Sequence, residues 1–118
     1  MTGGSQADNA VSALTRVASL SDVPDFEMLA VNIEGIKLAL FNLGGGEIRA
    51  TANICTHEFA ILTDGWFEGC EIECPLHSGR YDVRTGKALC EPPKRDLATF
   101  DVEIRNGDIF VALPERAR

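Results

Sequence analysis

Residues 55–77 read CTHEFAILTDGWFEGCEIECPLH and contain both histidines of the chain together with three of its four cysteines. Four of these residues belong to two short arms, Cys55-Thr56-His57 and Cys74-Pro75-Leu76-His77, which are separated by sixteen residues. Each arm offers one thiolate and one imidazole, and both groups are common ligands of metal ions in proteins. We therefore expect a metal centre at Cys55, His57, Cys74 and His77.

The mixed composition of the arms bears on which metal they hold. A single tetrahedral zinc ion can accept two cysteines and two histidines, but zinc-binding arms usually pair Cys with Cys and His with His. Arms that each carry one Cys and one His suit a two-iron cluster, with both cysteines on one iron and both histidines on the other. The oxidised cluster is then neutral, whereas four thiolates would leave two negative charges. Adding an electron is easier, so we expect a potential of roughly −150 to +300 mV.

The carboxyl-terminal part of the chain has the alternation of a β-hairpin. In 100–105 and 109–113, apolar residues occupy every second position, and Asn106-Gly107 separates the two runs. Asn-Gly between alternating runs is a strong hairpin signal, because both turn positions favour a positive φ. The pattern predicts two antiparallel strands joined by a two-residue turn.

The amino-terminal half reads in a similar way. Apolar runs at Phe26–Ile33 and Ile36–Leu43 flank Glu34-Gly35, and a further strand is expected at Glu47–Ala52, after three glycines. No stretch keeps a helical period over three turns. We therefore predict an all-β fold of antiparallel sheets, either a sandwich or a small barrel.

The chain divides into three parts. Residues 1–13 are small and polar, and we expect a flexible tail there. Residues 14–118 are expected to form a single domain, since the length allows one core and no more. Within it, residues 53–92 show little alternation and are rich in Cys, His, Gly and Pro, so this region is expected to hold the loops that bind the metal.

The motif sequences resemble those of a known family. CTHEFAILTDG at 55–65 and CPLHSGRYDVRTGKAL at 74–89 closely resemble the Rieske-type [2Fe–2S] ferredoxins of bacterial aromatic-ring-hydroxylating dioxygenase systems. The resemblance covers about residues 15–114. It implies an all-β base with a smaller cluster-binding subdomain of two loops. It also implies that Cys55 and Cys74 bind a buried iron, while His57 and His77 bind the iron near the surface.

The resemblance also implies a function. Proteins of this family carry single electrons from an NAD(P)H-dependent flavin ferredoxin reductase to a terminal Rieske non-haem iron oxygenase in aromatic compound degradation. The chain is then an electron carrier and not an enzyme, with no catalytic residues of its own. Two alternatives stay open: the small subunit of an assimilatory reductase such as nitrite reductase, and a zinc-stabilised binding module without a redox role.

Acidic residues outnumber basic ones by 18 to 11, which gives the chain a formal net charge of −7. Nucleic acids and anionic membranes are therefore not expected partners, because phosphate binding needs clustered lysine and arginine. The strongest apolar run, Leu38–Phe41, is far shorter than the ~20 residues of a membrane-spanning helix. The first residues lack a secretory signal pattern, so we expect a cytoplasmic protein in which disulfides are rare.

The remaining cysteines are not placed as ligands. Respiratory Rieske proteins have an additional cysteine in each arm, and a disulfide joins the two; Ala60 and Leu76 stand at those positions here. Cys70 and Cys90 lie elsewhere, and we expect free thiols rather than a bridge between them.

Without that disulfide, side-chain packing has to hold the arms. Phe59, Trp66, Phe67 and Tyr81 are four aromatic residues close to them, and we expect these rings to do so. The Tyr81 hydroxyl is a candidate hydrogen-bond donor to the Cys55 sulfur, where it would raise the potential. The alternative is that Tyr81 is only a core aromatic residue.

The segment between the arms is acidic. It contains Glu58, Asp64, Glu68, Glu71 and Glu73 and no basic residue. One interpretation is a docking rim that steers the protein toward basic patches on its partners. The other is an ordinary solvated loop.

Overall fold

The computed structural model describes residues 8–54, 60–76, 79–89 and 96–114 of the chain. It confirms the predicted all-β fold, because the regular structure of these residues consists of antiparallel strands and two single-turn 3-10 helices, η1 (Leu20–Asp22) and η2 (Leu62–Asp64). The strands are β2 (Asp8–Ser19), β3 (Met28–Ile33), β4 (Ile36–Asn42), β5 (Ile48–Ala52), β6 (Trp66–Glu68), β7 (Glu71–Glu73), β8 (Arg80–Asp82), β9 (Thr99–Phe100), β10 (Val102–Arg105) and β11 (Asp108–Pro114).

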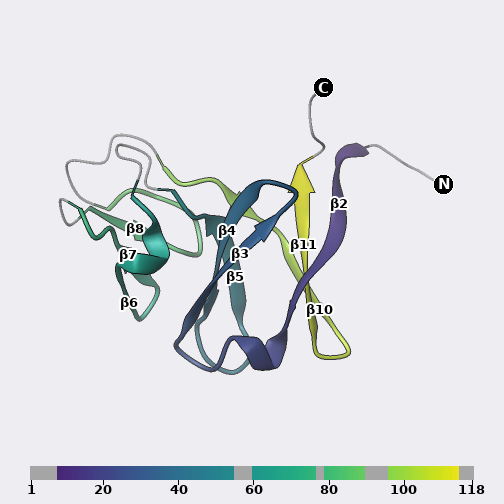
Figure 1. Ribbon diagram of the computed structural model, residues 1–118, viewed down its shortest axis with the longest axis horizontal. Coiled ribbons are helices and arrows are strands. Elements are labelled where there is room, and N and C mark those ends of the chain that lie inside the picture. Colours follow the sequence, from purple (N-terminus) through teal and green to yellow (C-terminus); the bar gives the residue numbers. More distant parts are fainter. Residues whose placement is uncertain (1–7, 55–59, 77–78, 90–95, 115–118) are drawn as a thin grey trace.

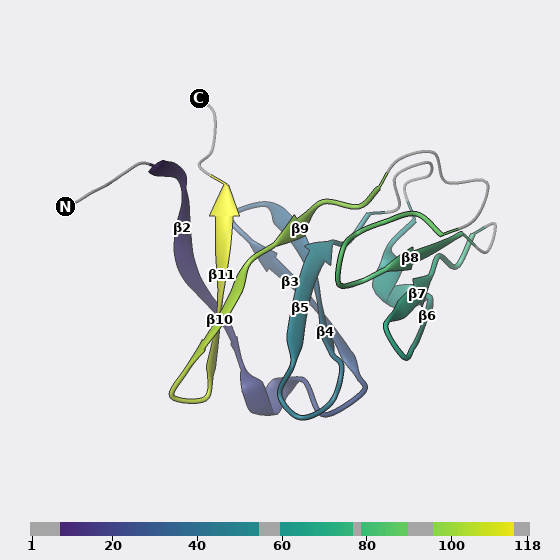
Figure 2. The ribbon, with the colours of Figure 1, turned by 180° about the vertical axis from the view of Figure 1, so that it is seen from behind.

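The described strands form three sheets. The four-stranded sheet β3-β4-β5-β9 and the three-stranded sheet β10-β11-β2 make up a base, and the small sheet β6-β7-β8 lies to one side of it (Figures 1 and 2). The chain passes from one base sheet to the other at Asp101, since β9 pairs with β5 and β10 pairs with β11. The run of alternating residues at 100–105 is therefore divided between two sheets.

Both predicted hairpins are confirmed. β3 and β4 pair antiparallel around Glu34 and Gly35, whose φ angles are 53° and 82°. β10 and β11 pair in the same way around Asn106 and Gly107, with φ angles of 52° and 81°. Two successive positive φ angles define the turn whose twist matches that of the flanking strands.

Strand β4 links the two hydrophobic clusters of the protein. Successive side chains of a strand point to opposite faces, so Leu38 and Leu40 face one way while Ala39 and Phe41 face the other. All four are fully buried. Leu38 and Leu40 belong to the base cluster, between the two larger sheets, with Ile109 and other residues of β11. Ala39 and Phe41 belong to a second cluster, which comprises Ala39, Phe41, Ala60, Leu62, Ile72, Cys74, Tyr81, Val83 and Leu97.

The predicted tail at 1–13 stays a prediction for residues 1–7, which lie outside the described residues, whereas Ser12 and Ala13 at its end are paired in a sheet. β2 begins at Asp8 and pairs with β11, with Ala13 opposite Leu113 and Ser12 opposite Pro114. Backbone hydrogen bonds to a neighbouring strand need no apolar side chains, so a small, polar sequence can still be part of a sheet.

The small sheet was not predicted. The region 53–92 was expected to hold loops, yet β6, β7 and β8 lie within it. Each has three residues, which is too short for an alternating pattern to stand out in a sequence.

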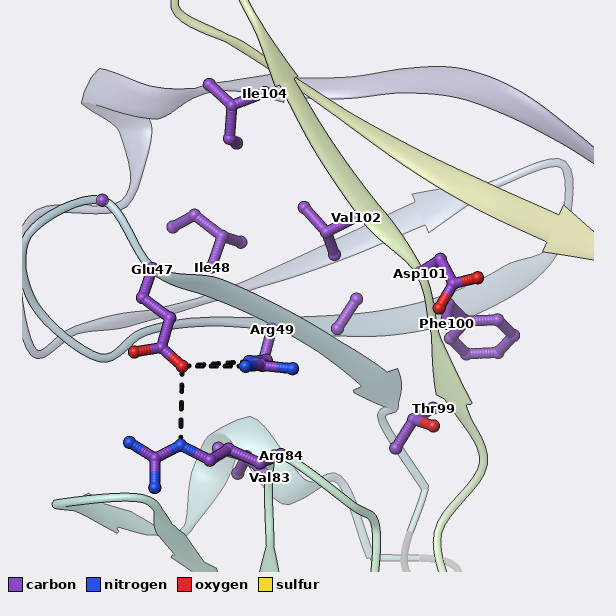
Figure 3. Close-up of a pocket in the computed structure, with 12 residues that line it drawn as sticks. Glu47, Ile48, Arg49, Val83, Arg84, Thr99, Phe100, Asp101, Val102 and Ile104 are labelled. Carbon is purple, nitrogen blue, oxygen red and sulfur yellow. Dashed lines mark hydrogen bonds and ion pairs between the residues drawn. The ribbon is translucent and has the colours of Figure 1, made fainter.

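An ion-pair cluster lies where the small sheet meets the base. Arg49 Nη2 is 2.9 Å from Glu47 Oε2, and Arg84 Nε, from the turn after β8, is 3.4 Å from the same oxygen. The three residues line a cavity of about 450 Å³ that Ile48, Val102 and other residues of β5, β9 and β10 complete (Figure 3). The hydrogen bond from Arg49, aided by the charge of Arg84, holds the pKa of the Glu47 carboxyl below its usual value of 4.5.

We expect Glu47→Gln to lower the melting temperature slightly at neutral pH, because an exposed ion pair contributes little. A carboxyl whose pKa is lower in the folded state adds stability above its unfolded pKa and loses it as the pH falls through the folded pKa. The difference between the native protein and the variant should therefore be present at neutral pH and shrink below about pH 4.5. Thermal unfolding followed by circular dichroism across this range measures it. Glu27→Gln removes the same charge from an exposed residue before β3 and is the control; equal losses for both variants at every pH would contradict the prediction.

Candidate metal centre

Of the four predicted ligands, the described residues include Cys74. It directly follows β7 and is completely buried. Cys55, His57 and His77 lie outside the described residues. The structure does describe the chain on both sides of each arm, and these flanking residues show how the fold positions the arms.

One backbone hydrogen bond joins the start of the second arm to the residue before β8. The Cys74 N–H donates to the Gly79 carbonyl over 2.6 Å, and both residues are buried. Next to this bond, Glu73 at the end of β7 pairs with Arg80 at the start of β8. The second arm thus connects two neighbouring strands of the small sheet, and the position of Cys74 is set by the sheet itself.

The first arm is held at its base by Asn53, which follows β5. The Leu62 N–H donates to the Asn53 carbonyl over 2.9 Å, and Ile54 pairs with Ile61 as an isolated bridge. The buried Asn53 side chain donates from Nδ2 to Thr63 Oγ1 and accepts from the Thr63 N–H, both over 2.9 Å. Residues 54 and 61 are therefore brought together on either side of the first arm.

The residues that flank the two arms lie side by side. Gly65 follows η2, and a Cβ placed on Gly65 would lie only 1.9 Å from the carbonyl oxygen of Glu73, the residue before Cys74. The next residue, Trp66, pairs with Glu73. Ala60 and Leu62, which follow the first arm, share one buried cluster with Cys74 of the second. The fold thus brings residues that follow the first arm close to Cys74, the first residue of the second arm.

The surroundings of Cys74 fit a metal ligand that faces away from solvent. Its neighbours in the cluster are apolar, including Leu62 and Ile72, and neither is exposed. A bare thiolate is unfavourable in such a place, whereas a bound metal cation stabilises it. The expectation that Cys55 and Cys74 hold the inner iron of a cluster stays a prediction.

The packing roles predicted for the aromatic residues are confirmed for Phe67 and Tyr81 and wrong for Trp66. The Phe67 ring lies 5.1 Å from that of Phe41, and Tyr81 is fully buried opposite Ile72. Trp66 is 63% exposed, because it alternates with Phe67 along β6 and so points outward. Phe59 lies outside the described residues.

The remaining cysteines and the acidic residues are described only in part. Cys70 is a half-buried free thiol, and Cys90 lies outside the described residues. Asp64, Glu68 and Glu71 are exposed and Glu73 is half-buried, whereas Glu58 lies outside the described residues. The acidic surface is mixed in sign, since Arg80 Nε lies 3.9 Å from Glu71 Oε1. No helix among the residues that the structure describes is long and apolar enough to span a membrane.

Comparisons with known proteins agree with this arrangement. Residues 13–101 match the model of the Rieske [2Fe-2S] domain. The ferredoxin component of the naphthalene 1,2-dioxygenase/salicylate 5-hydroxylase systems of Ralstonia sp. is 51% identical over 96 residues, which cover 81% of this chain and 91% of that protein.

Solved structures are similar as well. The Sphingomonas yanoikuyae B1 ferredoxin matches 86% of this chain and 100% of its own, with 38% identity and a TM-score of 0.81. A structure described as the complex of reduced oxygenase and oxidized ferredoxin in carbazole 1,9a-dioxygenase matches 89% of this chain and 97% of its own, with 33% identity and a TM-score of 0.80. A putative NADH-dependent nitrite reductase small subunit from Mycobacterium tuberculosis shares the fold, at 19% identity, 87% and 96% coverage and a TM-score of 0.74.

The family match covers most of the chain, and the buried Cys74 lies within it. The chain belongs to the Rieske [2Fe–2S] domain family, has a Rieske-type [2Fe–2S] cluster as its cofactor, and is similar to the ferredoxin components of aromatic dioxygenase systems.

Proposed function

We propose that this protein carries single electrons from an NAD(P)H-dependent flavin ferredoxin reductase to a terminal Rieske non-haem iron oxygenase that acts on an aromatic compound. The observation that carries the proposal is the 51% identity to a dioxygenase-system ferredoxin along 91% of that ferredoxin's length. The reductase takes two electrons from the nicotinamide onto its flavin and passes them on one at a time. The cluster supplies the one-electron chemistry, and the protein supplies its position and surroundings.

The ligands proposed for the cluster are Cys55 and Cys74 on the inner iron and His57 and His77 on the outer one. The full burial of Cys74 supports the first assignment, since the inner iron is the one that lies away from solvent. With both histidines of the chain bound to iron, neither is available as a catalytic base. We therefore assign no catalytic residue. A cytoplasmic location is also part of the proposal.

The alternatives carry less support. The nitrite reductase small subunit matches at 19% identity, a level that reflects a shared fold. A zinc-stabilised module without redox chemistry does not agree with the match to a [2Fe-2S] family.

The function is tested on the purified protein, with the reductase and oxygenase components of the naphthalene dioxygenase system of Ralstonia sp. as partners. We expect two irons and two acid-labile sulfides per chain, visible absorption, and an electron-spin-resonance signal after reduction. The protein should also couple NAD(P)H oxidation to oxygenase turnover. Colourless protein that contains zinc and no sulfide would contradict the cluster, and an intact cluster that does not couple the two components would contradict the carrier role.

Gly65 is proposed to keep the two arms in contact. We expect Gly65→Ala to lower the iron content per folded chain severalfold, because the added methyl group collides with the Glu73 carbonyl and displaces Cys74. Iron and sulfide analysis of the monomeric fraction measures this. Gly69→Ala is the matched control, since its Cβ meets nothing within 4 Å and the change costs only about 1 kcal/mol for a left-handed alanine. Equal iron contents in both variants would show that the close contact at Gly65 does not matter.

Tyr81 is proposed to donate a hydrogen bond from its hydroxyl to the Cys55 sulfur. Tyr81→Phe keeps the buried ring and removes the donor. Hydrogen bonds to sulfur stabilise the reduced cluster, so we expect the midpoint potential to fall by about 40 mV, equivalent to a hydrogen bond of about 1 kcal/mol in a one-electron couple. Protein-film voltammetry measures the change. An unchanged potential with full iron content would mean that Tyr81 is only a core aromatic residue.

A further inference from the structure

The outward face of the small sheet presents a tryptophan among carboxylates. In the register of the sheet, Trp66 lies opposite Glu73 and Glu73 opposite Arg80, while Glu68 lies opposite Glu71. These five residues, here called the outer face, line a groove of about 260 Å³.

Trp66 is not needed to fill the hydrophobic core. On the opposite side of the sheet, Phe67, Ile72 and Tyr81 point into the buried cluster, and the last two are fully buried. Trp66 is 63% exposed on a paired strand, so the largest side chain of the segment is held in water by its register. Exposed tryptophans on ordered surfaces are typical of residues that contribute most to binding.

The charges of the outer face select a cationic occupant. Three glutamates and one arginine line the groove, which leaves a net negative charge. An indole face attracts a guanidinium group, and carboxylates beside it can accept its paired hydrogen bonds. A second copy of this chain is a poor occupant, because its net charge of −7 opposes self-association through an acidic face.

The outer face leads directly to the second arm. The row Trp66, Glu73 and Arg80 is the end of the sheet next to Cys74, since Glu73 precedes it in the chain. Leu76, within the same arm, is 47% exposed. A protein bound to the outer face therefore lies beside the arm that is proposed to hold the cluster.

We propose that the outer face is the docking surface for the terminal oxygenase, which presents an arginine against Trp66 between the carboxylates of Glu68, Glu71 and Glu73. The inference rests on the proposed function. We choose the oxygenase over the reductase because a related ferredoxin of 33% identity has been solved in a complex with its oxygenase. A tryptophan that docking buries would anchor such a complex.

The test measures electron delivery alone. Dithionite-reduced protein, freed of excess reductant, is mixed in a stopped-flow instrument with the oxidised oxygenase component of the Ralstonia sp. naphthalene dioxygenase system. We expect Trp66→Ala to lower the second-order rate constant about tenfold, the effect typical of losing an anchor residue. Glu71→Gln and Glu73→Gln should each lower it severalfold at low salt and flatten its dependence on ionic strength.

The controls separate docking from damage to the cluster. Phe26→Ala removes an aromatic residue that is 68% exposed in the segment before β3, and we expect it to leave the rate unchanged. All variants should retain the native spectrum, iron content and midpoint potential, which a loss of structure would alter.

Three results would overturn the docking proposal alone, and a fourth would overturn the proposed function with it. A native rate for Trp66→Ala would contradict the docking proposal but not the proposed carrier function. A rate lowered equally by Phe26→Ala shows that the outer face has no special role. If an outer-face variant is impaired only in accepting electrons from the reductase, the outer face binds the reductase instead of the oxygenase. If the native protein delivers no electrons to the oxygenase, the proposed function fails and the docking proposal fails with it.

Discussion

The burial of β4 on both faces is the constraint on which the rest of the structure depends. Leu38 and Leu40 fill the base cluster, while Ala39 and Phe41 fill the cluster that contains Cys74. Because the two sets alternate along one strand, the base and the metal-binding part cannot move independently without opening one of the clusters. The contact between the Phe41 and Phe67 rings extends this coupling to β6 of the small sheet.

Backbone contacts fix the described residues on either side of the arms. Asn53 closes the base of the first arm, the bond between Cys74 and Gly79 closes the second, and Gly65 allows the two bases to approach. Such contacts act in the folded state, whereas a disulfide mainly restricts the unfolded chain.

In the small sheet, side chains alternate between a face that packs on the core and a face that is exposed. Its inward residues, Ile72 and Tyr81, pack around Cys74 and exclude water from it. Its outward residues are charged or aromatic and remain available to a partner. The three short strands thus bury Cys74 on one face of the sheet and leave Trp66 and charged residues accessible on the other.

The sequence by itself determined the family and both hairpins, and the ligand arms stay its prediction. Those signals are local: the spacing within each arm, and turns such as Asn106-Gly107 whose backbone angles follow from two residues. The tertiary structure alone decided that Asp8–Ser19 is a strand, that the chain changes sheets at Asp101, and that Trp66 points outward while Phe67 points inward. The first two depend on partner strands distant in the sequence, since β2 pairs with β11 and β9 with β5. In strands of three residues such as β6, the register with the neighbouring strand and the packing beneath it, rather than the local pattern, set which face is buried.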